Sequence, residues 1–288
     1  MSAIATTSRA TRRRPLRIWP TGLGAGGQVS LGVLVLVALM ATVGPFLVAA
    51  DPNAVDLSYA YEPPGRWFPL GTDASGRDLL ARLVYGSRTA LLGPLFVVLI
   101  ATLLGTVLGL TAVWFGGWVD SLAVRFIDAV FAFPGILLAI LAAALFGAGL
   151  TAAVLALSVA YLPYVARVVR SAALQERNLP YVAALRVQGL PGFAISARHI
   201  LPNVAGLVVA NATLCFGWAL IDLAALSFIG FGVQPPTADW GAIVGGGLSG
   251  VLQGAPNEAL FASALIVATV AAVNTLGDRL LTRSEATR

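Results

Sequence analysis

The chain has 288 residues, of which 58% are hydrophobic and 11% charged, and its net charge is +5. Its mean hydropathy of +0.87 is typical of a membrane protein. All 18 basic residues are arginines, so the chain cannot form a nucleotide-binding P-loop or a lysine Schiff base. A single cysteine, Cys215, and a single histidine, His199, also exclude disulfide frameworks and His/Cys metal sites.

The sequence begins with a polar, arginine-rich stretch that includes TSRATRRRPLR. We predict that residues 1–28 are a retained cytoplasmic tail, because the apolar segment after them can span a bilayer and lacks a clear cleavage site. The predicted membrane helices are 29–50, 89–113, 122–146, 150–169, 203–230 and 258–277, since about 20 apolar residues cross a bilayer. The fold class is therefore all-α, a polytopic membrane protein with six transmembrane helices.

The arginines are distributed unevenly between the two predicted sides of the membrane. Most lie in the N-terminal tail, in the central loop 170–202 and near the C-terminus, whereas the loop 231–257 contains none. Because cytoplasmic loops carry the excess of positive charge, both termini and the central loop are predicted to be cytoplasmic, including a C-terminal tail at 282–288. Because the arginines cluster beside apolar segments, we interpret them as residues that set the orientation of the chain in the membrane rather than as a nucleic-acid-binding surface.

Residues 51–88 form a predicted extracytoplasmic segment. It includes an amphipathic helix over 71–85, with Asp73 as the expected N-cap. This helix is either an interfacial lead-in to the second span or a contact surface for a partner protein. Arg77 and Asp78 are expected to be solvated or paired locally.

Two carboxylates, Asp128 and Asp222, lie in the interior of predicted spans. Arg125 and Asp128 lie three residues apart, which predicts an ion pair on one helix face near the membrane surface. Asp222 is isolated within LCFGWALIDLAALSFIG, and a carboxylate inside a span is a candidate functional residue because its desolvation is costly. Asp222 is expected either to face a pathway between the helices or to bond a neighbouring helix.

A basic island that contains prolines separates the apolar segments between residues 175 and 202. We predict two short helices in it, over 175–188 and 192–199, joined by a left-handed turn at Gly189 with Pro191 just after it. Such a helix pair, which carries both apolar side chains and arginines, can lie flat on a surface. That surface is either the headgroup region of the bilayer or a groove on a partner protein.

The island resembles the cytoplasmic loop motif of permease subunits in binding-protein-dependent ABC importers. That motif reads E-A-A, three residues, glycine, nine residues, then I-x-L-P. This sequence has Ala183-Ala184-Leu185, then Gly189, then His199-Ile200-Leu201-Pro202 at the same spacing. In the family this loop docks into a cleft of the ATPase subunit. Ala183 stands in place of the motif glutamate and Leu185 in place of its second alanine, so the docking contact of the glutamate is missing from this sequence.

Three further stretches resemble the dipeptide, oligopeptide and nickel class of these permeases. They are PLGTDASGRDLLARLVYGSRTAL at 69–91, GGWVDSLAVRFIDAVFAFP at 116–134 and FIGFGVQPPTADWG at 228–241, and the first marks the permease of the pair that carries G-T-D-x-x-G-R-D. The resemblance implies a type I ABC importer permease fold, with a five-helix core at 89–281 and a coupling loop at 170–202. It is specific for the type of subunit and much less specific for the cargo.

The resemblance also implies roles for particular residues. The implied ATPase-coupling residues are Glu176, Ala183, Ala184, Arg186, Gly189, Phe193, Arg198, His199, Leu201 and Pro202. The residues expected to face the pathway or a binding protein are Asp222, Gln234, Asp239 and Trp240. No catalytic or metal-binding residue is expected on this chain.

The partners that the resemblance implies are a second, similar permease, two cytoplasmic ATPase subunits and an extracytoplasmic substrate-binding protein, all assembled at the plasma membrane. ATP and Mg²⁺ would be used by the ATPase subunits, and no cofactor would bind this chain. Peptides are the expected cargo, with nickel, heme or glutathione as alternatives. An ion-coupled secondary transporter is the rival class, but it would need further intramembrane carboxylates or repeated halves.

Overall fold

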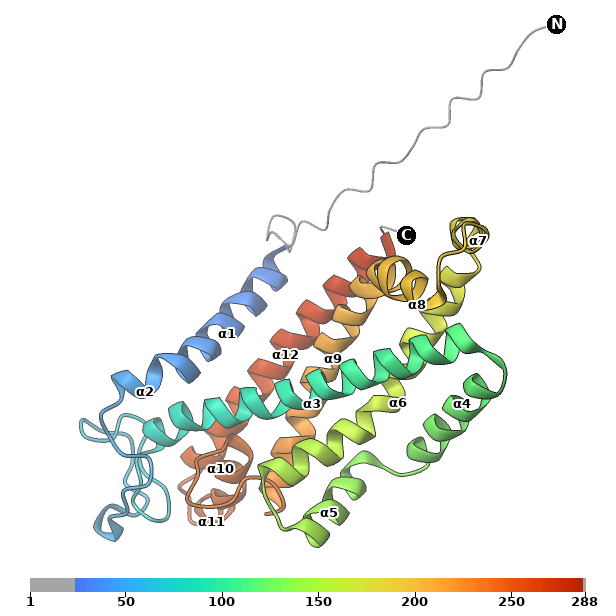
Figure 1. Ribbon diagram of the computed structural model, residues 1–288. Coiled ribbons are helices and arrows are strands. Elements are labelled where there is room, and N and C mark those ends of the chain that lie inside the picture. The colour runs from blue at the N-terminus through green and yellow to red at the C-terminus, as the bar shows by residue number, and fades with distance from the viewer. Residues whose placement is uncertain (1–23, 287–288) are drawn as a thin grey trace, which may run out of the picture.

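The computed structural model describes residues 24–286, so residues 1–23 of the predicted N-terminal tail and residues 287–288 of the predicted C-terminal tail lie outside this range (Figure 1). Its helices are α1 (Gly24–Thr42), α2 (Gly44–Leu47), η1 (Leu57–Tyr59), α3 (Leu79–Phe115), α4 (Gly117–Phe131), α5 (Gly135–Phe146), α6 (Leu150–Arg177), α7 (Pro180–Val187), α8 (Gly192–Ile195), η2 (Ser196–Ile200), α9 (Leu201–Phe228), α10 (Trp240–Gly246), α11 (Leu248–Leu252) and α12 (Asn257–Ala286). No strand is formed between residues 24 and 286, so the predicted all-α fold is confirmed.

Five described helical segments are long and apolar enough to cross a bilayer, namely α1, α3, α6, α8 with α9, and α12. A sixth crossing results if α4 and α5 are counted together, although they are bent by 79°. The predicted span at 122–146 is therefore divided into two helices, as the kink expected at a proline within a membrane span allows. The break falls at Pro134, the residue before α5, because proline has no amide hydrogen to continue the helix of α4.

The second span also begins earlier than the sequence predicts. The amphipathic outer helix and the predicted span at 89–113 are one helix, α3, of 37 residues. Its N-cap is Asp78, whose carboxylate accepts a hydrogen bond from the Leu80 amide at 2.9 Å. The predicted cap, Asp73, lies in the preceding loop instead. The first span ends at Thr42 rather than at residue 50, and Pro45 follows in the separate short helix α2.

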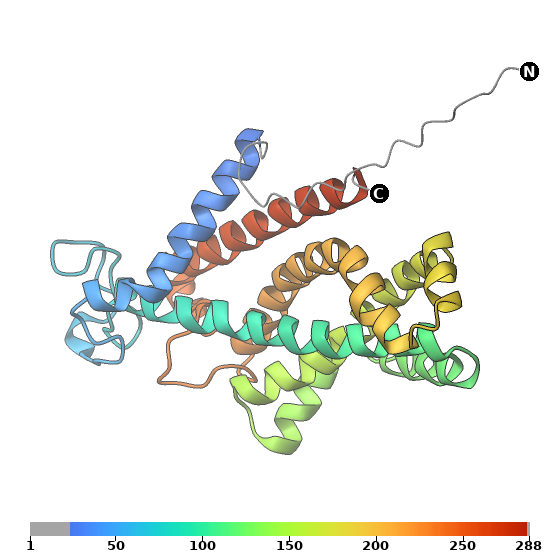
Figure 2. The ribbon, with the colours of Figure 1, turned by 45° about the horizontal axis from the view of Figure 1, so that its top comes forward.

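The helices separate two ends of the molecule (Figures 1 and 2). One end holds the start of α1, the end of α12 and the short helices α7 and α8. The opposite end holds α2, the loop that precedes α3, and helices α10 and α11. The central loop between α6 and α9, the start of α1 and the end of α12 thus lie on one side of the helical body.

Helices α3 and α6 approach each other closely in the core. A Cβ atom added at Gly105 would lie 2.8 Å from Val165 Cβ and 2.9 Å from the Leu162 carbonyl oxygen. One added at Gly109 would lie 2.8 Å from the Ala166 carbonyl oxygen. These glycines form a G-x-x-x-G pattern, which allows two membrane helices to approach backbone to backbone.

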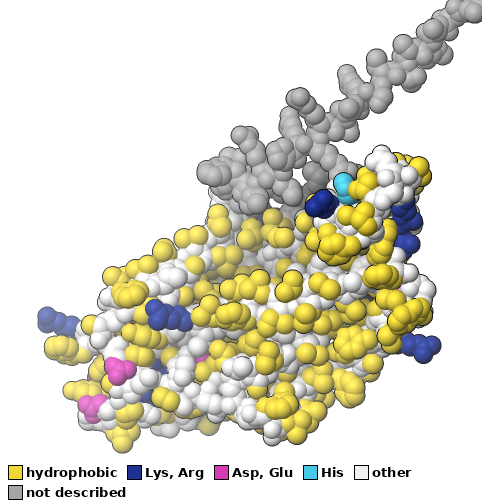
Figure 3. Space-filling model, viewed as in Figure 1, with side chains coloured by type: hydrophobic (Ala, Val, Ile, Leu, Met, Phe, Trp, Pro, Cys, Tyr) yellow, Lys and Arg dark blue, Asp and Glu magenta, His cyan; other side chains and the backbone are white. Residues whose placement is uncertain are grey.

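Apolar side chains cover most of the flank along which α3 runs (Figure 3). Leu103 and Val107 of α3 are exposed, as are Val35 and Leu36 of α1. In water, such a continuous apolar surface would be unfavourable, whereas lipid tails or a partner helix would cover it without cost to polar groups.

Candidate functional site

The loop between α6 and α9, called here the coupling segment (residues 178–202), consists of α7, α8 and η2. The prediction of a helix over 175–188 is wrong at its start, since α6 extends to Arg177 and a new helix begins at Pro180. Proline favours a helix start at the first helical position, because an amide hydrogen there would have no acceptor within the helix and the φ of proline is already helical. The predicted second helix is confirmed at Gly192, but from Ser196 it continues as π-helix η2 into α9.

Gly189 forms the turn between the two short helices, as predicted. Its φ is +79°, a left-handed value that glycine adopts without strain. The Gly189 amide donates to the Arg186 carbonyl at 3.0 Å, and the Leu190 amide donates to the Leu185 carbonyl at 3.2 Å. These bonds satisfy carbonyls at the end of α7, as expected of a glycine C-cap.

The coupling segment is anchored to the helical body by a small apolar core. Val182 of α7, Ile195 of α8 and Ile200 of η2 are buried against Val113 of α3 and Ala173 of α6. Because these side chains come from five elements, the segment is packed directly against α3 and α6.

Trp114, at the end of α3, fixes the segment from a second direction. The guanidinium carbons of Arg177 and Arg186 lie 5.8 and 5.1 Å from its ring centroid, within the range of cation–π attraction. The ring also occupies the position that a Cβ atom would take at Gly192, with Cε2 1.6 Å away. Glycine is thus required at the start of α8.

Glu176 joins the two membrane helices that flank the segment. Its Oε1 accepts hydrogen bonds from the Tyr181 hydroxyl at 2.8 Å and the Asn203 side-chain amide at 2.6 Å. Glu176 lies on α6, Tyr181 on α7 and Asn203 on α9. A half-buried carboxylate with two donors is a strong local clamp, because hydrogen bonds to charged groups are stronger than neutral ones.

Two large apolar side chains of the coupling segment are almost fully exposed. Val187 is 89% and Phe193 83% exposed, one on each side of the Gly189 turn. The other predicted coupling residues differ in exposure. The exposed ones are Ala183, Ala184, Arg186, Arg198 and Pro202, and the half-buried ones are His199 and Leu201. The structure thus brings the predicted residues together on one projecting element, with a rigid base and an exposed apolar tip.

At the opposite end, two of the predicted contact residues have structural roles. Trp240 is 1% exposed, and its Nε1 donates to the Leu83 carbonyl at 2.9 Å. Asp239 is 6% exposed and caps α10 by accepting from the Ala242 amide. Burial raises the pKa of the Asp239 carboxyl above its ordinary value. Asp239 and Trp240 are buried and Gln234 is exposed, and the contact roles of all three residues stay predictions.

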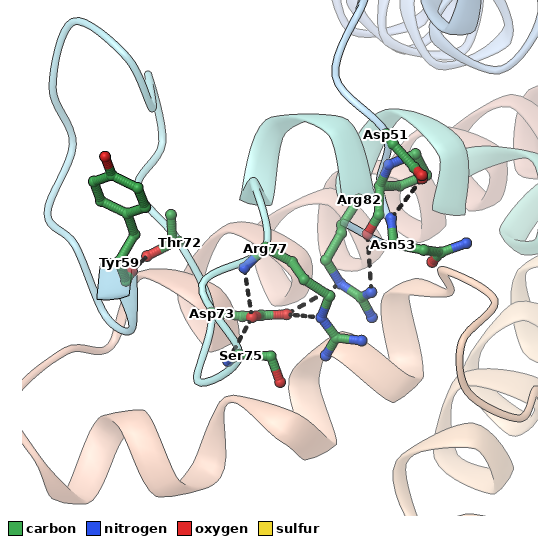
Figure 4. Close-up of polar contacts among 9 residues, drawn as sticks. Asp51, Asn53, Tyr59, Thr72, Asp73, Ser75, Arg77 and Arg82 are labelled. Carbon is green, nitrogen blue, oxygen red and sulfur yellow. Dashed lines mark hydrogen bonds and ion pairs between the residues drawn. The ribbon is translucent and has the colours of Figure 1, made fainter. Parts of the chain in front are cut away.

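The sequence reasoning missed a buried charge cluster at this end (Figure 4). The carboxylate of Asp73, itself 1% exposed, binds Arg77 Nε at 2.6 Å and lies 3.4 Å from Arg82 Nε. Glu258 of α12 is 4% exposed and lies within electrostatic range of Asp73 and Arg82. Arg82 of α3 attracts both carboxylates, so the cluster links the loop before α3 to α12 electrostatically. Adjacent letters in the sequence do not reveal it, because Glu258 is remote in the chain.

The carboxylates of α4 pair with α6 rather than with Arg125. Asp128 accepts from Arg167 Nη2 at 2.9 Å, and Asp120 receives both Arg170 Nε and Nη2, at 2.6 and 2.7 Å. The predicted pair of Arg125 and Asp128 is therefore wrong. Spacing by three residues permits a contact, but a bidentate or better-aligned arginine on the neighbouring helix is stronger.

Asp222 of α9 both bonds a neighbouring helix and lines a cavity. Its Oδ2 accepts a hydrogen bond from the hydroxyl of Tyr161 on α6 at 2.9 Å. The cavity, of about 510 Å³, is lined by Phe131, Phe133, Pro134, Gly135, Ala160, Tyr161, Tyr164, Trp218, Ile221 and Asp222. It opens where α4 ends and α5 begins, so the break at Pro134 helps to form it.

Comparison with known proteins gives matches along most of the chain. The family described as "Binding-protein-dependent transport system inner membrane component" matches residues 94–287. A Brucella suis biovar 1 protein named as a peptide transport system permease is 37% identical over 277 residues, 96% of this chain and 89% of the relative.

Two further relatives carry other cargo names. The glutathione transport system permease protein of Pectobacterium atrosepticum is 37% identical over 93% of this chain and 90% of its own length. The dipeptide transport system permease protein of Alkalihalophilus pseudofirmus is 36% identical over 88% and 83%. Among solved structures, a chain of the inward-facing MetNI methionine ABC transporter matches with a TM-score of 0.58 at 21% identity, covering 70% of this chain and 96% of that one. This last match supports the fold alone.

Proposed function

This chain belongs to the family of binding-protein-dependent transport system inner membrane components, and on that premise we propose that it is a permease subunit of an ATP-driven peptide importer. Relatives named for peptide and dipeptide transport support the cargo class. The chain is a multi-pass inner-membrane protein. In the proposed orientation both termini and the coupling segment are cytoplasmic, and this is supported by the common side of the coupling segment, the start of α1 and the end of α12.

The observation that carries the proposal is the exposed apolar tip of the coupling segment. Phe193 and Val187 project from an element whose base is buried against α3 and α6. An exposed aromatic side chain on a rigid platform is typical of an anchor that fills a groove on a partner. We propose that the groove belongs to an ATPase subunit, in preference to the headgroup region of the bilayer.

Two ATPase subunits would supply the chemistry, together with ATP and Mg²⁺, because this chain has no lysine with which to build a P-loop. Closure of the ATPase pair would pull on Val187 and Phe193. The buried base would pass the displacement to α3 and α6, and the Glu176 clamp would pass it to α9 through Asn203. A second, similar permease would complete the pathway, and an extracytoplasmic binding protein would deliver the cargo.

The docking proposal is tested by replacing Phe193 with aspartate in a co-expressed importer. We expect the Phe193→Asp chain to reach the membrane but to lose the ATPase subunits during co-purification, because a charge would be placed in an apolar groove. The matched control is Leu252→Asp in α11, since Leu252 is 82% exposed but lies at the opposite end. If Phe193→Asp retains the ATPase and transport at the level of the control, the docking site is elsewhere.

The cargo is tested by uptake in a strain that lacks the chain. Labelled dipeptides, longer peptides, glutathione and Ni²⁺ should be compared, and glutathione is included because a relative of equal identity is named for it. We expect ATP-dependent uptake of peptides. Peptide accumulation in liposomes that contain this chain alone and are driven only by an ion gradient would contradict the importer assignment and favour a secondary transporter.

A further inference from the structure

We propose that the cavity beside Asp222 holds the ammonium group of a peptide in transit, with the carboxylate as its charge partner and the aromatic rings as its walls. The inference rests on the proposed function and adds to it the chemistry by which the permease itself contacts its cargo. The name "aromatic cavity" is used below for the ten lining residues given above.

The first argument is the charge of the aromatic cavity. Asp222 is its only charged lining residue, since no arginine reaches the lining. A carboxylate has about four acceptor positions, and the Tyr161 hydroxyl occupies one of them. The remaining positions are available to a cation. An intramembrane carboxylate that faced lipid would be costly, so this face of α9 is expected to line a hydrated path or a partner subunit.

The second argument is the composition of the walls. Five aromatic side chains line the cavity: Phe131, Phe133, Tyr161, Tyr164 and Trp218. Aromatic faces attract organic cations within about 6 Å. One ring already does so, because the Arg167 guanidinium carbon lies 4.6 Å from the Phe131 ring centroid. Rings together with a carboxylate are the arrangement that recognises an ammonium group.

The same composition argues against a metal ion as the ligand. Transition-metal and divalent cations need several oxygen, nitrogen or sulfur donors. Within residues 24–286, no three His, Cys, Asp or Glu side chains gather to provide such a set. A single carboxylate among rings therefore favours an organic cation over Ni²⁺.

The third argument is that the walls are held in place without a ligand. The Tyr164 hydroxyl donates to Asn211 Oδ1 at 3.0 Å, and the Tyr164 and Trp218 rings meet edge to face with centroids 5.4 Å apart. Side chains fixed by their neighbours lose little entropy when a ligand binds. The volume of about 510 Å³ lies within the usual range of ligand pockets, roughly 300–1,000 Å³.

The position suits a transit site. Asp222 precedes the end of α9 at Phe228 by six residues, or roughly 9 Å along the helix, at the end remote from the coupling segment. Cargo released from the extracytoplasmic side would meet this cavity early. A low-affinity contact there would fit transport, since a transit site must also release its cargo.

The test uses the complete importer in proteoliposomes, with a labelled dipeptide delivered by the binding protein. We expect Asp222→Asn to lower the uptake rate roughly tenfold to hundredfold, the loss that follows removal of one charge-assisted interaction. Assembly with the partner permease and binding-protein-stimulated ATP hydrolysis should persist. Asp128→Asn is the matched charge control, because Asp128 also lies on a span but outside the cavity lining. Tyr161→Phe should cause a several-fold smaller loss than Asp222→Asn.

A second measurement examines the ammonium group directly. Ligand-observed NMR with the complete importer, but without the binding protein, should detect alanyl-alanine amide and not its N-acetyl form. The signal should disappear in Asp222→Asn.

Each remaining outcome overturns the inference in a distinct way. Equal losses in Asp222→Asn and Tyr161→Phe would show that the carboxylate only joins α6 to α9. Loss of the partner permease from Asp222→Asn would assign Asp222 to the subunit interface. Equal binding of the N-acetyl peptide would exclude ammonium recognition. If the wild-type importer takes up no peptide at all, the proposed function fails, whatever the variants do.

Discussion

Replacing Gly105 by leucine is expected to separate α3 from α6 and to destabilise the protein. The first added atom, Cβ, would lie 2.8 Å from Val165 Cβ and 3.0 Å from the Ala166 amide nitrogen, and backbone atoms cannot yield as a flexible side chain can. Overpacking of this kind costs about 1–3 kcal/mol. Leucine at an exposed helical glycine gains about 1 kcal/mol in helix propensity, so this gain must be subtracted with a control.

The control is Gly32→Leu in α1, where nothing lies within 4 Å of the added Cβ. Thermal unfolding in one detergent, followed by the loss of monodisperse protein, should place Gly105→Leu below wild type and Gly32→Leu at or above it. The expected difference between the two variants is about 1–3 kcal/mol, the overpacking cost alone, because both variants share the propensity gain. Equal midpoints for the two variants would show that α3 and α6 do not depend on this close approach.

Three further changes probe the coupling segment and the outer end. Gly189→Val should reduce ATP-dependent uptake without loss of the folded protein, because a β-branched residue at φ +79° is strained by about 1–2 kcal/mol; Gly254→Val, at the same φ in the outer loop, is the control for uptake. Trp240→Phe should lower stability by about 0.5–1.5 kcal/mol in thermal unfolding, because it leaves the Leu83 carbonyl without its donor. Burial raises the pKa of the Asp239 carboxyl in the folded protein. Its contribution to the free energy of unfolding is therefore full below the unfolded pKa of about 3.9 and is lost as pH rises through the folded pKa. Asp239→Asn should make the free energy of unfolding less dependent on pH in that range.

The Gly189 turn shows what local sequence can predict. A glycine after a helical stretch, followed by proline, favours a left-handed C-cap through its own backbone freedom, and the structure has φ +79° there. The G-x-x-x-G pattern at Gly105 and Gly109 is also a short sequence motif, and it predicts that a membrane helix packs closely against a neighbour. The sequence reasoning overlooked it, although it could have found it.

The ion pairs show what local sequence cannot predict. Arg125 is close to Asp128 in the chain, yet Asp128 pairs with Arg167 from α6. The burial of Trp240 likewise depends on α3, which supplies the Leu83 carbonyl. In both cases the competing partner comes from a remote helix, and its proximity is decided by packing rather than by spacing.

Composition and periodicity alone determined that this chain is a bundle of membrane-spanning helices, because apolar length and the need to satisfy backbone hydrogen bonds within each helix are local properties. The spacing of the loop motif also determined which residues gather on the segment between α6 and α9. Only the tertiary structure decided that Phe193 projects while Trp240 is buried, and that Asp222 meets Tyr161 in an aromatic cavity. Those outcomes depend on which distant side chains compete for the same space, and a linear sequence does not record that competition.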